Sequence, residues 1–267
     1  MNILEVNHLS KSFGLSIALK DVSFNLQESE ILGFLGPNGA GKTTTINCIM
    51  GFINPSSGYI KIFDKIIFDK ILRSRSNTDI KKYISYTSSE NIINEEWSAI
   101  EYVNFIYQFK NKSDYDKEII KSLDVPMNTK IKKLSYGNKQ KVALIIALIC
   151  SPKLIILDEP SRGLDPIITE KFHEILINLK NRGTSILLSS HDLAEVSKVA
   201  DRVAIIKDGS SIKIEDIKDL EDKTIYSISI DFKDQYNIKD FEKFITQSRK
   251  PQVFKPGDEC VPGAKYF

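Results

Sequence analysis

The spacing of hydrophobic residues changes along this chain and separates three kinds of element. In residues 1–27 apolar residues alternate with polar ones, as in half-buried antiparallel strands. Residues 31–35, 154–157 and 186–188 are short apolar runs, which are typical of parallel strands covered on both faces. Residues 142–150 form a longer run that we expect to be a buried helix, because a membrane-spanning helix needs about 20 residues. The pattern therefore predicts an α/β fold that begins with antiparallel strands.

A long polar segment interrupts this pattern. Residues 70–135 are rich in charged and polar residues, and we expect them to form a largely helical insertion. Within it, Ser98 and Glu101 have the spacing of a capping box, in which each side chain bonds to the backbone N–H of the other residue. Trp97 can pack on Tyr102 across the first turn of the same helix. A helix is therefore predicted to begin directly after Ser98.

The last part of the sequence changes character twice. Residues 203–209 and 211–216 read as two strands joined by a turn. Alternating and then helical spacing continues over 217–248, and proline and glycine interrupt the pattern from 249 onward. We therefore expect a nucleotide-binding domain over 1–216, a small accessory segment over 217–248 and a flexible tail over 249–267.

Composition limits the class of protein. The chain has 267 residues, of which 42% are hydrophobic and 27% charged, enough to bury a full core. Lys and Arg number 37 and Asp and Glu 35, so the net charge of +2 gives no reason to expect a nucleic-acid partner. Cys48, Cys150 and Cys260 are far apart and form neither a metal-binding spacing nor a disulfide framework. Because the first residues also show no secretory signal, we expect a reducing compartment.

Residues 36–44, GPNGAGKTT, carry the strongest chemical signal in the sequence. They stand between an apolar run and a segment of helical spacing, which is the strand, loop and helix order of a phosphate-binding loop. The glycines let backbone N–H groups turn toward a polyphosphate, and the following helix directs its positive dipole end at the same anion. Lys42 would bind the β- and γ-phosphates of ATP, and the Thr43 hydroxyl would bind Mg²⁺. The nucleotide-binding residues predicted in this loop are Gly36, Pro37, Asn38, Gly39, Ala40, Gly41, Lys42, Thr43 and Thr44.

Two adjacent carboxylates follow the apolar strand at 154–157. Asp158 and Glu159 precede Pro160, which ends the strand, so both lie at the carboxyl end of the predicted sheet, where ligands bind in open α/β folds. Because neighbouring residues of a strand point to opposite sides, we expect different roles for them. Asp158 would hold Mg²⁺, and Glu159 would orient and polarise the water that attacks the γ-phosphate.

Residues 134–142, LSYGNKQKV, resemble the LSGGQ signature of the ATP-binding-cassette (ABC) ATPases. Ser135 is placed to cap the helix that follows, and its hydroxyl with the free N–H groups of the first turn forms a site for an anion. The resemblance implies that Ser135 and Gly137 close on the γ-phosphate held by the other protomer of a dimer. Tyr136 and Asn138 differ from the signature, and both look like variants of the family's drug- and antibiotic-export branch.

Further motifs match the family in the same order along the chain. SRGLDP looks like the loop that joins the two active sites of a dimer, with Asp165 as its acid. ILLSSHD ends with His191 and Asp192, and His191 matches the histidine that contacts the γ-phosphate in this family. Phe13 in KSFG stands where the family stacks an aromatic ring on adenine, although a core phenylalanine of an ordinary strand also fits this position.

One position departs from the family. A glutamine, sometimes a glutamate, normally lies in the loop between the core and the helical subdomain, where it reaches Mg²⁺ and the attacking water. The segment YISYTSSE at 83–90 puts Ser89 at this position, and a serine side chain is too short for that reach. Either Glu90 takes the role after a small shift, or the coupling of ATP hydrolysis is altered in this chain.

The resemblance covers about residues 1–215 and implies an ATPase subunit of a membrane transporter. A separate transmembrane permease would supply the pathway, and it would hold the chain at the cytoplasmic face of the cell membrane. A second ABC ATPase subunit, identical or different, would complete the two ATP sites. Trp97, Phe105 and Tyr107 would border the groove for a cytoplasmic helix of the permease, although the core of the helical subdomain would suit them equally.

The sequence thus predicts a P-loop NTPase core of the α/β class with an antiparallel β subdomain, a helical insertion and a small C-terminal α+β extension. The predicted function is ATP hydrolysis that powers a transporter, with export of a drug, peptide or lipid-like compound as its direction. A soluble ABC ATPase acting on ribosomes or DNA would share the motifs, but it would carry two cassettes in tandem or a long coiled coil, which this chain lacks. A regulatory subunit that binds ATP and hydrolyses it poorly is supported only by Ser89.

Overall fold

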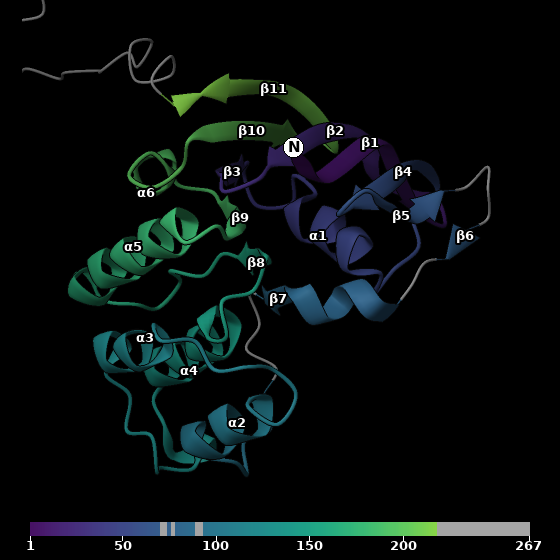
Figure 1. Cartoon of the computed structure of the whole chain (residues 1–267). Coiled ribbons are helices and arrows are strands. Elements are labelled where there is room, and N and C mark those ends of the chain that lie inside the picture. The colour runs from purple at the N-terminus through teal and green to yellow at the C-terminus, as the bar shows by residue number, and fades with distance from the viewer. Residues whose placement is uncertain (70–73, 76–77, 89–92, 218–267) are drawn as a thin grey trace, which may run out of the picture. The chain divides into compact units, whose positions relative to one another are not determined.

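The computed structural model describes residues 1–69, 74–75, 78–88 and 93–217 (Figure 1). Its strands are β1 (Asn2–Phe13), β2 (Ser16–Gln27), β3 (Ile31–Leu35), β4 (Ser57–Ile62), β5 (Lys65–Asp69), β6 (Ser74–Arg75), β7 (Ile84–Thr87), β8 (Leu154–Asp158), β9 (Ser185–Ser190), β10 (Arg202–Lys207) and β11 (Ser210–Asp216). Its α-helices are α1 (Lys42–Met50), α2 (Ala99–Ile106), α3 (Asp116–Leu123), α4 (Tyr136–Leu148), α5 (Pro166–Asn181) and α6 (Leu193–Val196). Two 3-10 helices cover Thr78–Tyr83 and Ile131–Lys133. Ser89, Glu90 and the predicted segments beyond residue 217 lie outside the described residues.

One mixed sheet joins the described strands in the order β6-β5-β4-β1-β2-β11-β10-β3-β9-β8-β7. β1 pairs antiparallel with both β2 and β4, which confirms the predicted antiparallel start. β10, β3, β9, β8 and β7 pair in parallel and form the nucleotide-binding side of the sheet. β10 and β11 form the predicted hairpin, and β11 connects the two parts by pairing with β2. The α/β class predicted from the sequence is confirmed.

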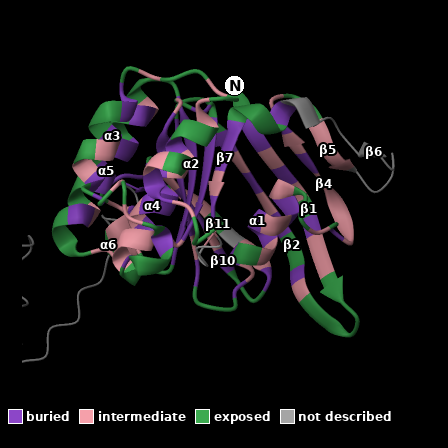
Figure 2. Cartoon of the chain, turned by 90° about the horizontal axis from the view of Figure 1, so that it is seen from below, coloured by how far each residue is buried: buried purple, intermediate pink, exposed green. Residues whose placement is uncertain are grey.

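The parallel strands are buried on both faces, and each face belongs to a different core (Figure 2). Leu154 and Ile156 of β8 pack in the core around α1 and the antiparallel strands. Ile155 and Leu157 of the same strand pack in the core formed with α3, α4 and α5. This division explains why the strands read as unbroken apolar runs rather than as alternating ones. The carboxyl ends of these strands are thereby fixed from both sides, and the P-loop, Asp158 and Glu159 lie at these ends.

The helical insertion is shorter than its sequence suggested. Residues 84–87 of the segment predicted to be largely helical form β7, which pairs in parallel with β8 at the edge of the main sheet. The strand is only four residues long and includes buried Ser85 and Thr87, so it shows no apolar run in the sequence. The α-helices of the insertion begin with α2. The apolar run 142–150 forms most of buried α4, and no helix of the described residues is long and apolar enough to cross a membrane.

The start of α2 agrees with the capping prediction. The backbone N–H of Ser98 donates to the Glu101 carboxylate at 2.7 Å, and the N–H of Glu101 donates to the Ser98 hydroxyl at 3.4 Å. The rings of Trp97 and Tyr102 lie 4.9 Å apart between centroids, as expected for the staple across the first turn. Local sequence therefore marks where this helix begins, and a distant segment also holds this start, because the N–H of Ile100 donates to the carbonyl of Met127 at 3.0 Å.

Replacing Ser98 by alanine should lower the free energy of unfolding by about 1 kcal/mol, because the capping oxygen is lost from a buried helix start. Urea denaturation at neutral pH measures this change. Asn104→Ala on the exposed side of the same helix is the matched control and should leave the unfolding midpoint nearly unchanged. A Ser98→Ala variant as stable as this control would show that the box contributes nothing to the stability of the subdomain.

Candidate functional site

The P-loop connects β3 to α1, and two of its glycines are required by geometry. A Cβ on Gly36 would lie 2.3 Å from the carbonyl oxygen of Ile206, so only glycine lets β3 leave the sheet this close to β10. Gly41 has a φ of 109° and is the N-cap of α1, a backbone conformation that side chains disfavour. These residues shape the loop so that the N-terminus of α1 faces the site. The sequence prediction of strand, loop and helix is confirmed in this region.

The Lys42 side chain folds back into the loop. Its Nζ donates to the carbonyl oxygens of Gly36 at 2.6 Å and Pro37 at 3.3 Å, and the side chain is almost fully buried. The same ammonium lies 3.1 Å from Oε1 of Glu159, an ion-pair distance, although this oxygen accepts no hydrogen bond of good geometry. The fixed cation is thus inside the loop where a polyphosphate would lie.

Thr43 and Asp158 meet beside the loop. The Thr43 hydroxyl donates to Oδ2 of Asp158 at 2.8 Å, and the Ser189 hydroxyl donates to Oδ1 at 2.6 Å. Within the described chain no group of three or more His, Cys, Asp or Glu side chains could hold a metal by itself. One hydroxyl and one carboxylate beside a phosphate site instead fit Mg²⁺, which takes few protein ligands together with phosphate oxygens and water.

Glu159 reaches the same site by a turn of the backbone. We expected strand alternation to point Asp158 and Glu159 to opposite sides, but β8 ends at Asp158 and Glu159 has a left-handed φ of 50°. Its N–H is held by the carbonyl and the hydroxyl of Ser189, at 3.2 and 3.1 Å. The sharp turn therefore brings both carboxylates to one site, and their different surroundings separate their roles.

His191 completes a row of polar side chains with Lys42 and Glu159. Its Nδ1 lies 2.7 Å from Oε2 of Glu159, whose other oxygen faces Lys42. His191 follows β9 directly, and its ring is half exposed, whereas the Glu159 side chain is only 15% exposed. Glu159 therefore lies between a buried cation and an accessible imidazole, an arrangement in which a carboxylate can exchange protons.

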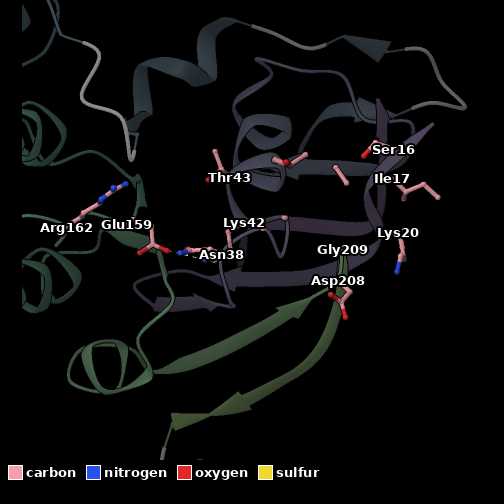
Figure 3. A pocket seen from close by; sticks show the side chains of 14 residues that line it. Ser16, Ile17, Lys20, Asn38, Lys42, Thr43, Glu159, Arg162, Asp208 and Gly209 are labelled. Carbon is pink, nitrogen blue, oxygen red and sulfur yellow. Dashed lines mark ion pairs between the residues drawn. The ribbon is translucent and has the colours of Figure 1, made fainter. Parts of the chain in front are cut away.

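Lys42, Thr43 and Glu159 lie at one end of a cavity of about 690 Å³, a size suited to a nucleotide, whose wall does not include Asp158 or His191 (Figure 3). Arg162, from the segment SRGLDP, also lies at this end, and Thr44 and Asn38 line the wall. The other end is lined by the chain around β2 and by the turn between β10 and β11. The residues that contribute there are Ser16, Ile17, Ala18, Lys20, Asp208 and Gly209.

Phe13, the residue predicted to stack on adenine, does not line this cavity. Its ring is half exposed and lies 4.7 Å from the Lys11 ammonium, and it does not belong to the cavity wall. Ile17 lines the wall instead, and Asp208 joins it because the N–H of Gly209 donates to the carbonyl of Ala40 at 3.1 Å. No sequence motif marks Ile17 or Asp208. Asp208 reaches the cavity wall only because its turn packs on the P-loop.

The signature segment lies apart from this cavity. The exposed Ser135 caps α4 by accepting a hydrogen bond from the N–H of Asn138 at 3.3 Å, and neither Ser135 nor Gly137 lines the cavity. Asp165 caps α5 in the same way, accepting from Ile168 at 2.9 Å. The structure thus gives Ser135 and Asp165 helix-capping contacts in their own chain. It does not join either residue to Lys42 within one cavity.

Comparison with known proteins identifies this arrangement. A family model described as ABC transporter matches residues 19–162, slightly more than half of the chain. The chain belongs to the ABC transporter ATP-binding family. A bacitracin transport ATP-binding protein of Bacillus licheniformis is 34% identical to this ABC ATPase over 79% of this chain and 69% of its own length. A lantibiotic transport ATP-binding protein of Streptococcus pyogenes is 33% identical, over 79% and 89% of the two chains.

Solved structures agree with this assignment. An ATP-binding subunit of an ABC transporter superposes with a TM-score of 0.71 at 28% identity, covering 83% of this chain and 92% of that one. A dimeric, post-hydrolysis ATP-binding cassette bound to ADP and Pi has a TM-score of 0.68 at 25% identity, covering 80% and 98%. The protein is therefore an ATP-binding subunit of the ABC type with ATPase activity, and the resemblance inferred from its motifs is confirmed.

Proposed function

We propose that two copies of this chain bind two ATP molecules head to tail and hydrolyse them between the copies. One observation supports this proposal. Within one chain, Lys42 lines the cavity, whereas neither Ser135 nor Gly137 does. An anion site at the exposed, capped start of α4 can then face the P-loop of the second copy. Contacts between ATP on one copy and the start of α4 on the other exist only in the closed dimer. ATP binding therefore shifts the population toward the closed dimer, and hydrolysis lets the dimer reopen.

Within each site, the side chains of this row have different roles. Glu159 orients and polarises the attacking water, Lys42 binds the β- and γ-phosphates, and His191 contacts the γ-phosphate while it holds Glu159 through the 2.7 Å contact. Lys42 exchanges its pairing with Glu159 for the phosphates as ATP enters. Thr43 and Asp158 would hold Mg²⁺, which neutralises charge on the phosphate oxygens. Ser89 or Glu90 remains the proposed partner of the water, and both lie outside the described residues.

The ATPase is further proposed to power a separate membrane permease at the cytoplasmic face of the membrane, in the direction of export. The names of the bacitracin and lantibiotic transport relatives support a cargo of the antibiotic or peptide class. An exposed aromatic row on the helical subdomain supports the docking surface. Phe105 is 44% exposed and Phe109 73% exposed, and Phe105 lies 5.3 Å from Trp97 and 5.0 Å from Phe109 between ring centroids. Tyr107 packs against the core instead, so we leave it out of this surface.

Co-purification tests the transporter assignment. Glu159→Gln protein is purified with ATP from detergent-solubilised native membranes, and we expect a polytopic membrane protein in stoichiometric amount. Phe105→Ser combined with Phe109→Ser should lose this partner while it keeps ATP binding, and Ile177→Ser, at an exposed position on α5, should keep it. Recovery with ribosomes or DNA would favour the soluble ABC ATPase and would contradict the transporter assignment.

A further inference from the structure

A buried carboxylate lies behind the two loops that carry Glu159 and His191. Glu195, in the short helix α6, has a side chain only 11% exposed. Its Oε2 accepts a hydrogen bond at 3.1 Å from the hydroxyl of Ser190, the residue directly before His191. The carbonyl of Ser190 in turn accepts from the N–H of Gly36 in the P-loop at 3.3 Å. Glu195 therefore holds the residue from which the His191 loop departs.

The same carboxylate also contacts the loop after Glu159. The Ser161 side chain, two residues beyond Glu159, lies beside Glu195, and Nε2 of His173 on α5 lies 3.9 Å from Oε1 of Glu195. Burial acts to raise the pKa of Glu195, but its partners His173, Ser161 and Ser190 together hold that pKa below the ordinary value. The group is thus a carboxylate anion at neutral pH that links β9, α5 and the segment after β8.

This arrangement lowers the stability of the folded state. Oε1 of Glu195 and both ring nitrogens of His173 are buried without a hydrogen bond of good geometry. Unsatisfied buried polar groups lower stability, and apolar residues of similar volume often replace a buried ion pair at no cost. The stability of the fold therefore gives no reason for a carboxylate at this position, whereas the position of His191 relative to Glu159 does.

We propose that Glu195 is a positioning residue for ATP hydrolysis, which fixes His191 in its 2.7 Å contact with Glu159 by bonding Ser190, the residue directly before His191. This inference rests on the roles proposed above for His191 and Glu159. Glu195 does not line the cavity, so it acts only through His191. Removing its charge should therefore change the catalytic step and leave ATP binding as it was.

The test measures kcat, KM and thermal stability of Glu195→Gln. We expect kcat to fall about ten- to hundredfold, as for small misplacements of catalytic groups, with KM within about twofold. Glu195→Leu combined with His173→Leu keeps the inference testable if the amide variant folds poorly, because apolar residues that replace both members of a buried pair often retain stability, and kcat should still fall. Normal kcat in a stable Glu195→Leu, His173→Leu protein would overturn the inference and leave Glu195 a structural residue.

The matched control lies between the same two parts of the chain. Glu170 on α5 pairs with Lys198 just after α6, but this pair is at the surface, so Glu170→Gln should leave kcat and KM unchanged.

A double variant separates the positioning role of Glu195 from the catalytic role of His191. In a His191→Ala background, Glu195→Gln should lower kcat by less than about twofold, because the group it positions is gone. A full, additive loss in that background would overturn the positioning role, whereas His191→Ala with normal kcat would refute the role of His191 itself.

Discussion

Glu159→Gln lowers kcat for ATP hydrolysis by about 10²–10⁴-fold and leaves ATP bound, because the amide keeps the shape of the side chain and cannot take a proton. Glutamine can still donate to or accept from His191, so the loop geometry is retained. It also removes the anion that faces Lys42, and the freed ammonium remains available to the phosphates. Affinity for ATP should therefore be equal to or higher than that of the wild type.

Phosphate release under steady-state and single-turnover conditions measures this effect, with Glu174→Gln on the exposed side of α5 as the control. The control should hydrolyse ATP at the wild-type rate. Equal and near-background rates in the wild type and Glu159→Gln would contradict the catalytic role. That result would favour a regulatory subunit that closes on ATP without hydrolysing it.

Lys42→Ala weakens ATP binding by about 10- to 150-fold, the loss expected for charge-assisted hydrogen bonds of about 1.5–3 kcal/mol. Two effects add, because the phosphates lose a fixed cation and the Glu159 carboxylate then faces them without its partner. Equilibrium binding of a fluorescent ATP analogue measures the change. Lys171→Ala, an exposed position on α5, is the control and should bind like the wild type. Unchanged affinity in Lys42→Ala would show that the polyphosphate does not lie in the P-loop.

Much of the site could be predicted from the sequence because its parts are local. The P-loop needs glycines at fixed spacing between a strand and a helix, and the caps Ser135 and Asp165 lie next to the helices they begin. His191 and the two acids follow apolar strands whose carboxyl ends meet at one edge of a parallel sheet. Local rules therefore fixed both the elements and the edge at which their functional residues gather.

Other features depend on contacts between distant parts of the chain. β7 is a strand because Tyr86 and its neighbours pair with β8, some seventy residues later (Tyr86↔Ile156). The left-handed turn at Glu159 is supported by Ser189, and Asp208 lines the cavity because its turn packs on the P-loop. Glu195 shows no periodicity or motif of its own, and its position becomes meaningful only when Ser161, His173 and Ser190 surround it. Such features leave no trace in the spacing of residues.

Complementation between two inactive variants tests the central claim, that each ATP site is completed by a second copy. Lys42→Ala inactivates the P-loop, and Ser135→Arg places a bulky cation at the start of α4 where the second copy would bind the γ-phosphate. In a mixed dimer one site carries both defects and the other site carries neither. We expect the mixture to hydrolyse ATP well above either variant alone, with a rate approaching that of one intact site in each mixed dimer. A mixture that hydrolyses ATP no faster than the average of the two variants would contradict the composite site.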